Sequence, residues 1–292
     1  MPEASLPAQR RASRAHWANS SFLYITAGCL ISAVFVGPLL WEVLRSFEPP
    51  TGVASPPSLK VFSELGVQAY TALLTGPDNI LRNILNSLIV AVGTAVLTAV
   101  VSMLAGYGFG RFRFRGSGLL FALMLLGLMV PFQAVLTPSF LELHYLHLLD
   151  SLEGLILFYT AFNLPFGVYL MRNTFLQLPG EIADAAKVDG ASVLSTLTRV
   201  FRPLIMPGVA TTALYAFLFG WTEFLAALTF LTSDNNFTLP VALSAVETGS
   251  HGAVNFNFLV AGAVIAMVPS VVVYIALQRY YVRGLMSGAL KG

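Results

Sequence analysis

LPGEIADAAKVDGASVLSTLTRVFRPLIMP, residues Leu178 to Pro207, is a long polar interruption in a chain that is otherwise mostly apolar. The segment predicts two short helices separated by Gly190. Glu181 and Asp184 fall in the first turn of the first helix, where negative charge interacts favourably with the helix dipole. Gly190 suits the left-handed conformation that ends a helix, and the Ser192 side chain can cap the next one.

The second helix of this segment is expected to run from Val193 to about Phe201 and to stop at Pro203 and Pro207, because proline cannot donate the hydrogen bond of a helix interior. The first helix is thin, so another protein could approach its backbone closely. Its small residues are Ala183, Ala185 and Ala186. The segment therefore predicts a docking surface, and the alternative is an ordinary amphipathic loop lying on the membrane surface.

The composition predicts an all-α membrane protein. The chain is 56% hydrophobic and 10% charged, with a mean hydropathy of +0.76. About 20 mostly apolar residues are needed for a helix to cross the hydrocarbon core, and barrel strands would give short alternating segments instead. Six charge-free stretches are of suitable length, so we expect six transmembrane helices: Phe22–Trp41, Ser87–Phe109, Gly118–Phe140, Leu155–Met171, Leu204–Trp221 and Phe258–Gln278.

Basic residues alternate between the loops and predict the orientation. Three of them, Arg45, Lys60 and Arg82, fall in one set of loops. The other set contains Arg10, Arg11, Arg14, Arg111, Arg113, Arg115, Arg172, Lys187, Arg199, Arg202, Arg279, Arg283 and Lys291. Because cytoplasmic loops carry the Lys/Arg excess, both termini and the segment 178–207 are expected in the cytoplasm. The net charge of +2 thus reflects membrane topology, and no nucleic-acid partner is expected.

The segments outside the spans give the domain organisation. Residues 1–20 are expected to be a polar cytoplasmic tail with little structure. A cleavable signal peptide is the alternative, but the apolar run from Phe22 is longer than usual for one, and no clear cleavage site follows it. Residues 48–76 are expected to form an outside loop that is partly helical between Leu59 and Leu74.

Catalytic and metal-binding patterns are weak in this sequence. Cys29 is the one cysteine, so no disulfide can form within the chain. His144 and His147 have the spacing of one helix face but no convincing further ligands, and we expect an ordinary polar loop and no metal site. The sequence contains no phosphate-binding glycine loop, no Gly-x-Ser-x-Gly and no His-Glu-x-x-His. Any ATP that drives this protein is expected on another chain.

The segment 178–207 also contains a known motif. Asp184-Ala185-Ala186, Gly190, Val200, Arg202 and Pro203 follow the spacing Glu-Ala-Ala, three residues, Gly, nine residues, Ile-x-Leu-Pro. This pattern resembles the coupling loop of ABC-importer permeases, the membrane subunits through which a substrate passes while a separate ATPase hydrolyses ATP. Asp replaces Glu, Val replaces Ile and Arg replaces Leu, and the last of these is the largest departure.

Four further segments resemble the carbohydrate branch of this family, which includes the maltose and glycerol-phosphate systems. They are Asp189-Gly190-Ala191-Ser192, Asn163-Leu164-Pro165-Phe166-Gly167, Trp221-Thr222-Glu223-Phe224 and the tail Arg283-Gly284-Leu285 with Gly288-Ala289-Leu290-Lys291-Gly292. The family has Asn where this chain has Thr222. The tail is typical of the shorter subunit type, and the likeness covers nearly all of residues 87–292.

The resemblance implies a type-I ABC importer permease with six transmembrane helices and a two-helix cytoplasmic coupling loop. The first span and external loop would occupy residues 21–84, the permease core residues 85–280 including the coupling loop 178–207, and a cytoplasmic tail residues 281–292. The chain would lie in the bacterial cytoplasmic membrane among its lipids. Its implied partners are a cytoplasmic ABC ATPase dimer that holds ATP and Mg, a homologous sister permease, an extracytoplasmic solute-binding protein and a sugar or sugar derivative; no cofactor is expected on this chain.

Two sets of site residues follow from the resemblance and the residue types. Contact with the ATPase is expected from Glu181, Asp184, Ala185, Ala186, Asp189, Gly190 and Ala191. The substrate pathway is expected to include Asn163, Trp221, Thr222 and Glu223. Glu223 is the ionisable group that lies far from a convincing helix end, and a charge at mid-bilayer costs roughly 2.5–3.5 kcal/mol even by lenient scales. The alternative places Glu223 near the outer interface.

Asn163, beside Pro165, could open a helix turn toward a hydroxylated substrate, or make an interhelical hydrogen bond. Asn86 and Ser87 are expected to be structural. An ABC permease for a non-sugar solute remains open. So does an ion-driven secondary transporter, which should display more intramembrane carboxylates. A membrane enzyme or assembly scaffold would explain the docking loop, but the sequence offers it no recognisable catalytic set.

Overall fold

The computed structural model describes residues 8–49, 65–76, 80–247 and 256–289. In these ranges every regular element is a helix. The long helices are α1 (Ala8–Arg45), α3 (Leu81–Arg111), α6 (Leu152–Leu176), α9 (Arg202–Thr222) and α12 (Phe256–Ala289). The expectation of an all-α protein is therefore confirmed for this part of the chain.

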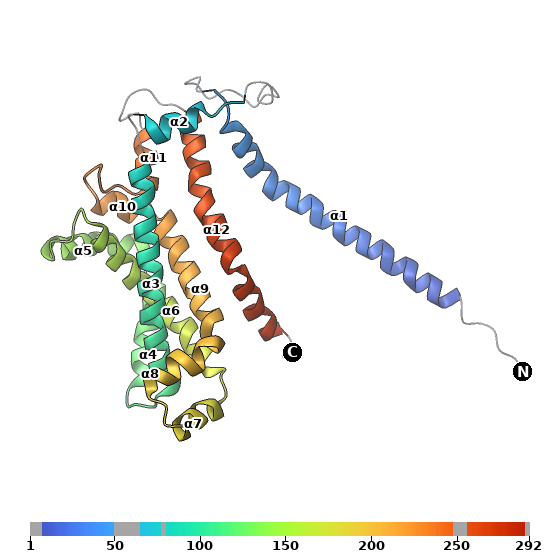
Figure 1. Cartoon of the computed structure of the whole chain (residues 1–292), viewed down its shortest axis with the longest axis vertical. Coiled ribbons are helices and arrows are strands. Elements are labelled where there is room, and N and C mark those ends of the chain that lie inside the picture. The colour runs from blue at the N-terminus through green and yellow to red at the C-terminus, as the bar shows by residue number, and fades with distance from the viewer. Residues whose placement is uncertain (1–7, 50–64, 77–79, 248–255, 290–292) are drawn as a thin grey trace, which may run out of the picture.

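Shorter helices join the long ones. They are α2 (Gln68–Thr75), α4 (Ser117–Leu126), the 3-10 helix η2 (Gly127–Met129), α5 (Phe132–Tyr145), α7 (Gly180–Val188), α8 (Val193–Ser195), the π-helix η3 (Thr196–Phe201), α10 (Leu225–Phe230) and α11 (Leu239–Glu247). In Figure 1, α4, α7 and α8 lie at one end of the bundle, and α2, α10 and α11 lie toward the other.

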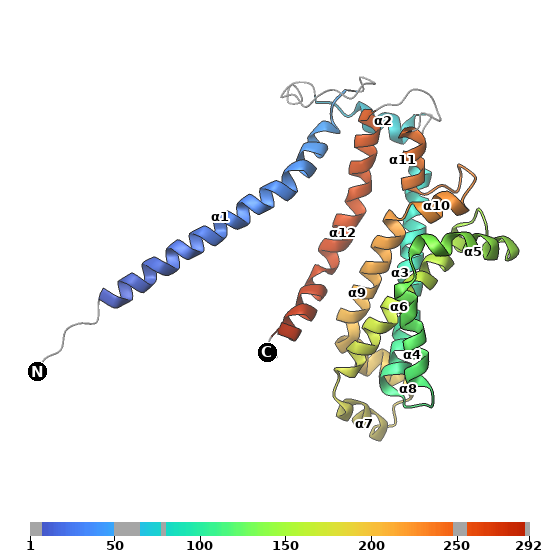
Figure 2. The same ribbon diagram turned by 180° about the vertical axis from the view of Figure 1, so that it is seen from behind.

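The core of the bundle is formed by α3, α6 and α9, with α12 packed against α9. Its buried hydrophobic residues include Val90, Tyr159, Phe217 and Ile205. By contrast α1 extends away from the bundle in both views (Figures 1 and 2). In the most apolar 18-residue segment of α1 no residue is buried, whereas half of the residues are buried in the corresponding segments of α6 and of Val193–Thr222. The apolar surface of α1 is therefore available to lipid or to another subunit.

Small residues allow α3 to lie close to its neighbours. Thr94, Thr98, Ser102 and Gly106 recur every four residues and are all buried, so they form one stripe along the helix. A Cβ placed on Gly106 would lie 2.5 Å from the Cβ of Met171 and 2.8 Å from the backbone nitrogen of Arg172. Without a hydrophobic driving force between helices in lipid, such close packing contributes much of the association.

The third expected span, Gly118–Phe140, is not one straight helix. Ser117–Met129 and Phe132–Tyr145 meet at 105°, so the chain has five helices long and apolar enough to cross a membrane, or six if this bent pair is one span. The break lies at Val130, which is extended (φ −77, ψ 121). Pro131 explains it, because proline lacks a donor and disfavours a helical conformation of the residue before it.

The structure corrects the expectation for the N-terminal tail. The tail was expected to have little structure, but α1 begins at Ala8. Its first residues, AQRRASRA, are mostly good helix formers with neither Gly nor Pro. At the other end, the expected span Phe258–Gln278 agrees with the apolar stretch Phe256–Gln278, and helix α12 itself continues to Ala289. The segment 48–76, expected as an outside loop, is helical at Gln68–Thr75, and residues 50–64, including Leu59, lie outside the described residues.

The second helix of the segment 178–207 does not stop at Pro203. Instead α8, η3 and α9 continue as one helical stretch of 30 residues, Val193–Thr222. Pro203 is the second residue of α9, so its missing N–H falls at the junction with the π-helix and not in the interior of a regular α-helix. The π-helix Thr196–Phe201 absorbs the change of register before it. The expectation that Pro203 and Pro207 end the helix is therefore wrong.

Candidate coupling surface and translocation face

The turn between α7 and α8 is tightly defined. Gly190 has φ +74, the backbone N–H of Ala191 donates to Ala186 O over 2.9 Å, and that of Gly190 donates to Lys187 O over 3.0 Å. This pair of bonds is the Schellman motif. The backbone N–H of Ser195 donates to Ser192 Oγ over 3.2 Å. The expected left-handed glycine and the expected serine cap are both confirmed.

One face of α7 packs on its own chain. Ile182 and Ala183 lie against a buried cluster, and Ala186 is buried. The cluster consists of Met171, Phe175, Leu197, Phe201 and Ile205. Ala186 was expected to contact a partner protein, but it is buried within this chain, on the same stripe of the helix as Ile182 and Ala183.

The opposite face of α7 is open. Of the residues expected to contact the ATPase, Glu181, Asp184, Ala185, Asp189 and Gly190 are exposed, and Ala191 is half-buried. Asp184 accepts a hydrogen bond from Lys187 Nζ over 3.2 Å. Their role toward a partner stays a prediction.

Three exposed apolar residues beside this face were missed from the sequence. Val188 is 88% exposed, Val193 57% and Leu194 65%. The spacing of Val188 from Glu181, Asp184 and Ala185 places it on the same helix face, and a helical wheel could have found it. The surface formed by Glu181, Asp184, Ala185, Val188, Asp189, Gly190, Val193 and Leu194 is called here the coupling surface.

The coupling surface is firmly attached to the bundle. The ring centroids of Tyr107 and Phe175 are 5.2 Å apart, and those of Phe175 and Phe201 6.0 Å. Arg111 Nη2 donates to Leu178 O over 2.9 Å, and its guanidinium lies 5.2 Å from the ring centroid of Phe201. These contacts join α3, α6 and η3 directly beneath α7, so a displacement of the surface would move the helices with it.

The four expected pathway residues fall into two groups. Asn163 and Trp221 are buried inside the chain. Asn163 Nδ2 donates to Tyr159 O over 2.7 Å within α6, and α6 continues past Pro165 without opening. Trp221 Nε1 donates to Ala266 O over 2.9 Å and so ties α9 to α12. Neither side chain faces out of the bundle.

Thr222 and Glu223 lie where α9 ends. Thr222 is exposed and its hydroxyl donates to Leu218 O over 2.8 Å. Glu223 is half-buried and extended (φ −69, ψ 133). Its carboxylate accepts backbone N–H bonds from Leu225 over 2.7 Å and Ala226 over 3.0 Å.

Glu223 therefore caps α10, and it also accepts a hydrogen bond from the Tyr159 hydroxyl. The expectation that it lies far from a helix end is wrong, since the Trp221–Phe224 element breaks the helix. The carboxylate has a structural role, because it accepts hydrogen bonds from the first N–H groups of α10, which have no partner within the helix.

Replacing Glu223 by Ala is expected to destabilise the solubilised chain by roughly 2–3 kcal/mol, through the lost cap and the unpaired buried hydroxyl of Tyr159. Glu223→Gln keeps one acceptor oxygen and should cost less. In the Tyr159→Phe background the cost of Glu223→Ala should shrink. The thermal midpoint measures all three. An unchanged midpoint for Glu223→Ala, together with lost uptake, would mean that Glu223 contacts the solute instead.

Polar side chains hold the loops at the end of the bundle that is distant from α7. Asn86 Nδ2 donates to Asn235 O over 2.9 Å and to Phe237 O over 3.0 Å. The backbone N–H of Leu239 donates to Ser87 Oγ over 2.7 Å. The structural roles expected for Asn86 and Ser87 are confirmed.

A second clamp joins the α5–α6 loop to the loop after α10. The Asp150 carboxylate accepts backbone N–H bonds from Thr232 over 2.9 Å and Ser233 over 3.0 Å, as well as the Ser233 hydroxyl. Desolvation acts to raise the pKa of Asp150, but hydrogen bonds from Ser233, Thr232 and Asn236 outweigh it and lower the pKa to about 2. The clamp is thus ionised and intact at neutral pH.

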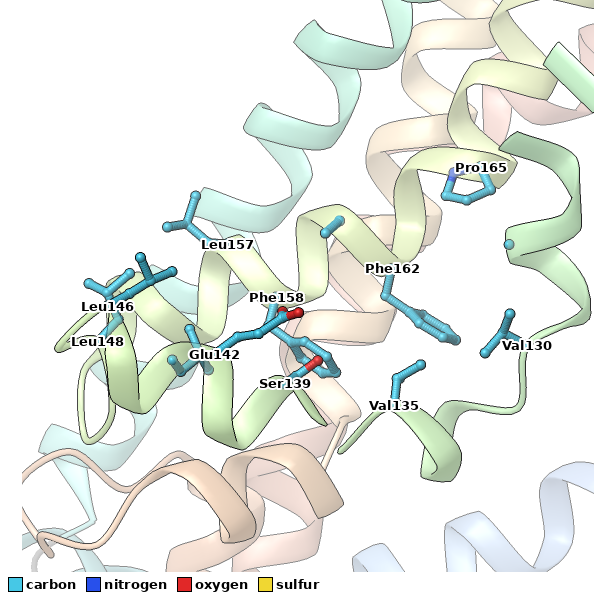
Figure 3. Close-up of a pocket in the computed structure, with 13 residues that line it drawn as sticks. Val130, Val135, Ser139, Glu142, Leu146, Leu148, Leu157, Phe158, Phe162 and Pro165 are labelled. Atoms are coloured by element: carbon cyan, nitrogen blue, oxygen red, sulfur yellow. The ribbon is translucent and has the colours of Figure 1, made fainter. Parts of the chain in front are cut away.

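A cavity of about 380 Å³ lies between the broken third span and α6. Figure 3 shows Phe158 and Phe162 of α6 projecting toward Val135 and Ser139 of α5. The walls are mostly apolar, and Glu142 adds a carboxylate. Among the described residues no group of three or more metal-ligating side chains is found. His144 lies in α5 and His147 just after it.

Comparison with known proteins gives a consistent picture. Residues 100–287 match the family described as "Binding-protein-dependent transport system inner membrane component". The chain is 33% identical over 273 residues to a trehalose/maltose transport system permease protein, MalG, of Thermococcus litoralis, covering 92% of this chain and 96% of that one. It is 31% identical to an arabinooligosaccharides transport system permease protein, AraQ, of Bacillus subtilis, covering 90% and 93%.

A solved structure has the same fold. The chain superimposes with a TM-score of 0.71 and 22% identity on a chain from the crystal structure of a bacterial ABC transporter involved in the import of the acidic polysaccharide alginate. The match covers 96% of this chain and 100% of that one. The type-I permease architecture inferred from the sequence is therefore confirmed as a fold.

Proposed function

The chain belongs to the binding-protein-dependent transport inner-membrane components, and from this we propose that it is the permease subunit of an ATP-driven importer for a sugar or sugar derivative. The permease role follows from the family. The sugar class rests on relatives named for trehalose/maltose, arabinooligosaccharide and trehalose transport. Delivery by an external binding protein is part of the same proposal, since the family is named for it.

The coupling surface is the observation that carries the mechanism. It is exposed, it mixes carboxylates with apolar side chains, and it is rigidly attached to α3, α6 and α9. A cytoplasmic ATPase dimer that holds ATP and Mg is proposed to dock there. Closure of the dimer on ATP would then rock the bundle between inward-facing and outward-facing states.

The chain is proposed to supply half of the pathway, beside a homologous sister permease. Exposed apolar surface on α1 and α12 is consistent with contact to a further membrane subunit. In their most apolar 18-residue segments, 0% and 11% of the residues are buried. Of the expected pathway residues, Thr222 and Glu223 are proposed to face the pathway, and the buried Asn163 and Trp221 are proposed to support it from within. The cavity beneath the third span gives α5 room to move against α6.

An ion-driven secondary transporter is the second candidate from another class. It is less favoured because the intramembrane carboxylate Glu223 already serves to cap α10. Collapse of uptake by an uncoupler at constant ATP would favour it over the ABC importer.

The proposal is tested by cross-linking in a Cys29→Ser background, which removes the exposed thiol of the chain. Val188→Cys on the coupling surface should cross-link to an ABC ATPase and be labelled by an impermeant thiol reagent from the cytoplasmic side only. Thr232→Cys, exposed at the other end of the bundle, is the matched control. It should form no cross-link to the ATPase and should be labelled from the external side only. Labelling of Val188→Cys from outside, or cross-links to no ATPase, would overturn the proposed orientation and coupling.

A further inference from the structure

The end of α3 and the loop that joins it to α4 carry three arginines that alternate with phenylalanines, Arg111-Phe112-Arg113-Phe114-Arg115. Between Asp78 and Glu142 the sequence contains no acidic residue. Within the described residues, no carboxylate pairs with Arg113 or Arg115. The loop is therefore a concentration of positive charge without local neutralisation.

These arginines line one cavity. It has a volume of about 630 Å³, and its walls include Arg111, Arg113, Arg115, Ser117 and Leu176. Arg111 is held in place by its bond to Leu178 O and by the Phe201 ring. Its Nε is buried without a hydrogen-bond partner among the described residues. Because that atom is buried, a ligand in the cavity would meet the exposed side chains of Arg113 and Arg115 instead.

The rest of the wall also favours an anion. Helix α4 begins at Ser117, whose backbone N–H donates to Phe114 O over 3.2 Å. The helix has no side-chain cap, so the positive end of its dipole lies beside the arginines. Apolar rings lie beside the arginines. Phe112 and Phe114 are 49% and 44% exposed, and both line the same cavity.

We propose that this cavity binds a phosphate group, specifically the phosphodiester headgroup of an anionic lipid, with the neighbouring phenylalanines in contact with its acyl chains. Guanidinium groups and helix N-terminal amides are the donors that phosphate oxygens prefer. Basic pockets beside transmembrane helices favour anionic headgroups in the same way. The site stands independently of the transported solute, and only the assignment to the cytoplasmic leaflet rests on the orientation given under Proposed function.

Simple topology signalling is the competing explanation, since the same arginines would favour the cytoplasm by charge alone. That explanation requires neither a cavity nor a fixed Arg111. It predicts that any two cytoplasmic arginines contribute equally to lipid attraction, which provides the contrast for the experiment.

The test is lipid binding to the full-length chain in nanodiscs or by native mass spectrometry, with phosphatidylglycerol, phosphatidylcholine and inorganic phosphate as probes. The double variant Arg113→Gln/Arg115→Gln should bind phosphatidylglycerol roughly tenfold to thirtyfold more weakly. The matched control Arg199→Gln/Arg202→Gln, also exposed but outside the cavity, should bind it normally. Phosphatidylcholine binding should not change in either variant.

The outcomes separate the possibilities. Equal losses in both double variants, or no loss in Arg113→Gln/Arg115→Gln, would overturn the site. Competition by millimolar inorganic phosphate would show that a soluble phosphate is the ligand and overturn the lipid assignment. If the glutamine variant does not fold, Arg113→Lys/Arg115→Lys replaces it, and it should retain part of the affinity because the charge stays and the bidentate geometry is lost.

Discussion

Gly190→Val is expected to reduce uptake at least tenfold while the chain still folds and enters the membrane. At φ +74 a β-branched residue is strained by roughly 1–3 kcal/mol, and each 1.4 kcal/mol is a factor of ten in an equilibrium. No atom lies within 4 Å of the position that a Cβ would take there, so the strain falls on the backbone of the turn. The Schellman bonds should open and the coupling surface should lose its shape.

The measurement is uptake together with substrate-stimulated ATPase activity in reconstituted vesicles, at matched amounts of assembled complex. Gly180→Val is the control, because Gly180 lies in the same segment, also has open space around it, and has no positive φ. Gly190→Asn should keep most activity, since asparagine tolerates the left-handed conformation. Normal uptake and normal ATPase stimulation in Gly190→Val would contradict the proposed coupling.

Gly106→Val is expected to destabilise the chain by about 3 kcal/mol or more. Gly106 lies where α3 crosses α6, and the new side chain would meet the Cβ of Met171 and the backbone of Arg172. Backbone atoms of a packed helix cannot yield as a flexible side chain can, so the two helices must separate. The separation would also loosen the contacts beneath the coupling surface.

The thermal midpoint of the solubilised chain measures this effect. Gly108→Val is a closely matched control, two residues along the same helix, because no atom lies within 4 Å of its Cβ position. Both substitutions add the same side chain and the same helix propensity cost. Equal midpoints for the two variants would mean that α3 and α6 do not depend on this contact.

Much of the coupling segment could be predicted because its signals are local. A glycine that must adopt φ > 0 and a serine that caps the next helix depend on neighbouring residues only, and Gly190 and Ser192 behave as expected. The apolar stretches likewise fixed the helical class, since the bilayer leaves the backbone few alternatives. The motif spacing gave the family correctly.

The failures occurred where tertiary context or helix register decides. Pro203 was expected to end a helix, but a π-helix before it lets the chain continue. Pro131 breaks the third span, although the apolar run continues through it. Ala186 resembled a docking residue until its helix face was known.

The substrate pathway was the least predictable part. Trp221 and Asn163 have chemistry suited to sugars, but Trp221 Nε1 bonds to α12 and Asn163 Nδ2 bonds to its own helix. The residue type predicts which groups a side chain can bind, but its orientation depends on how the helices pack. Thr222 and Glu223 stay predictions for the pathway.

The continuity of Val193–Thr222 has a mechanical consequence. Helix α9 alone has 21 residues and spans about 32 Å, so tilting it by about 10° displaces its far end by roughly 5 Å. Its near end joins η3 beside the coupling surface, and its far end carries Thr222 at the break before α10. A movement at the coupling surface would then reach the end of α9 at Thr222 directly, because one helix connects the two regions, and no series of small side-chain rearrangements is required.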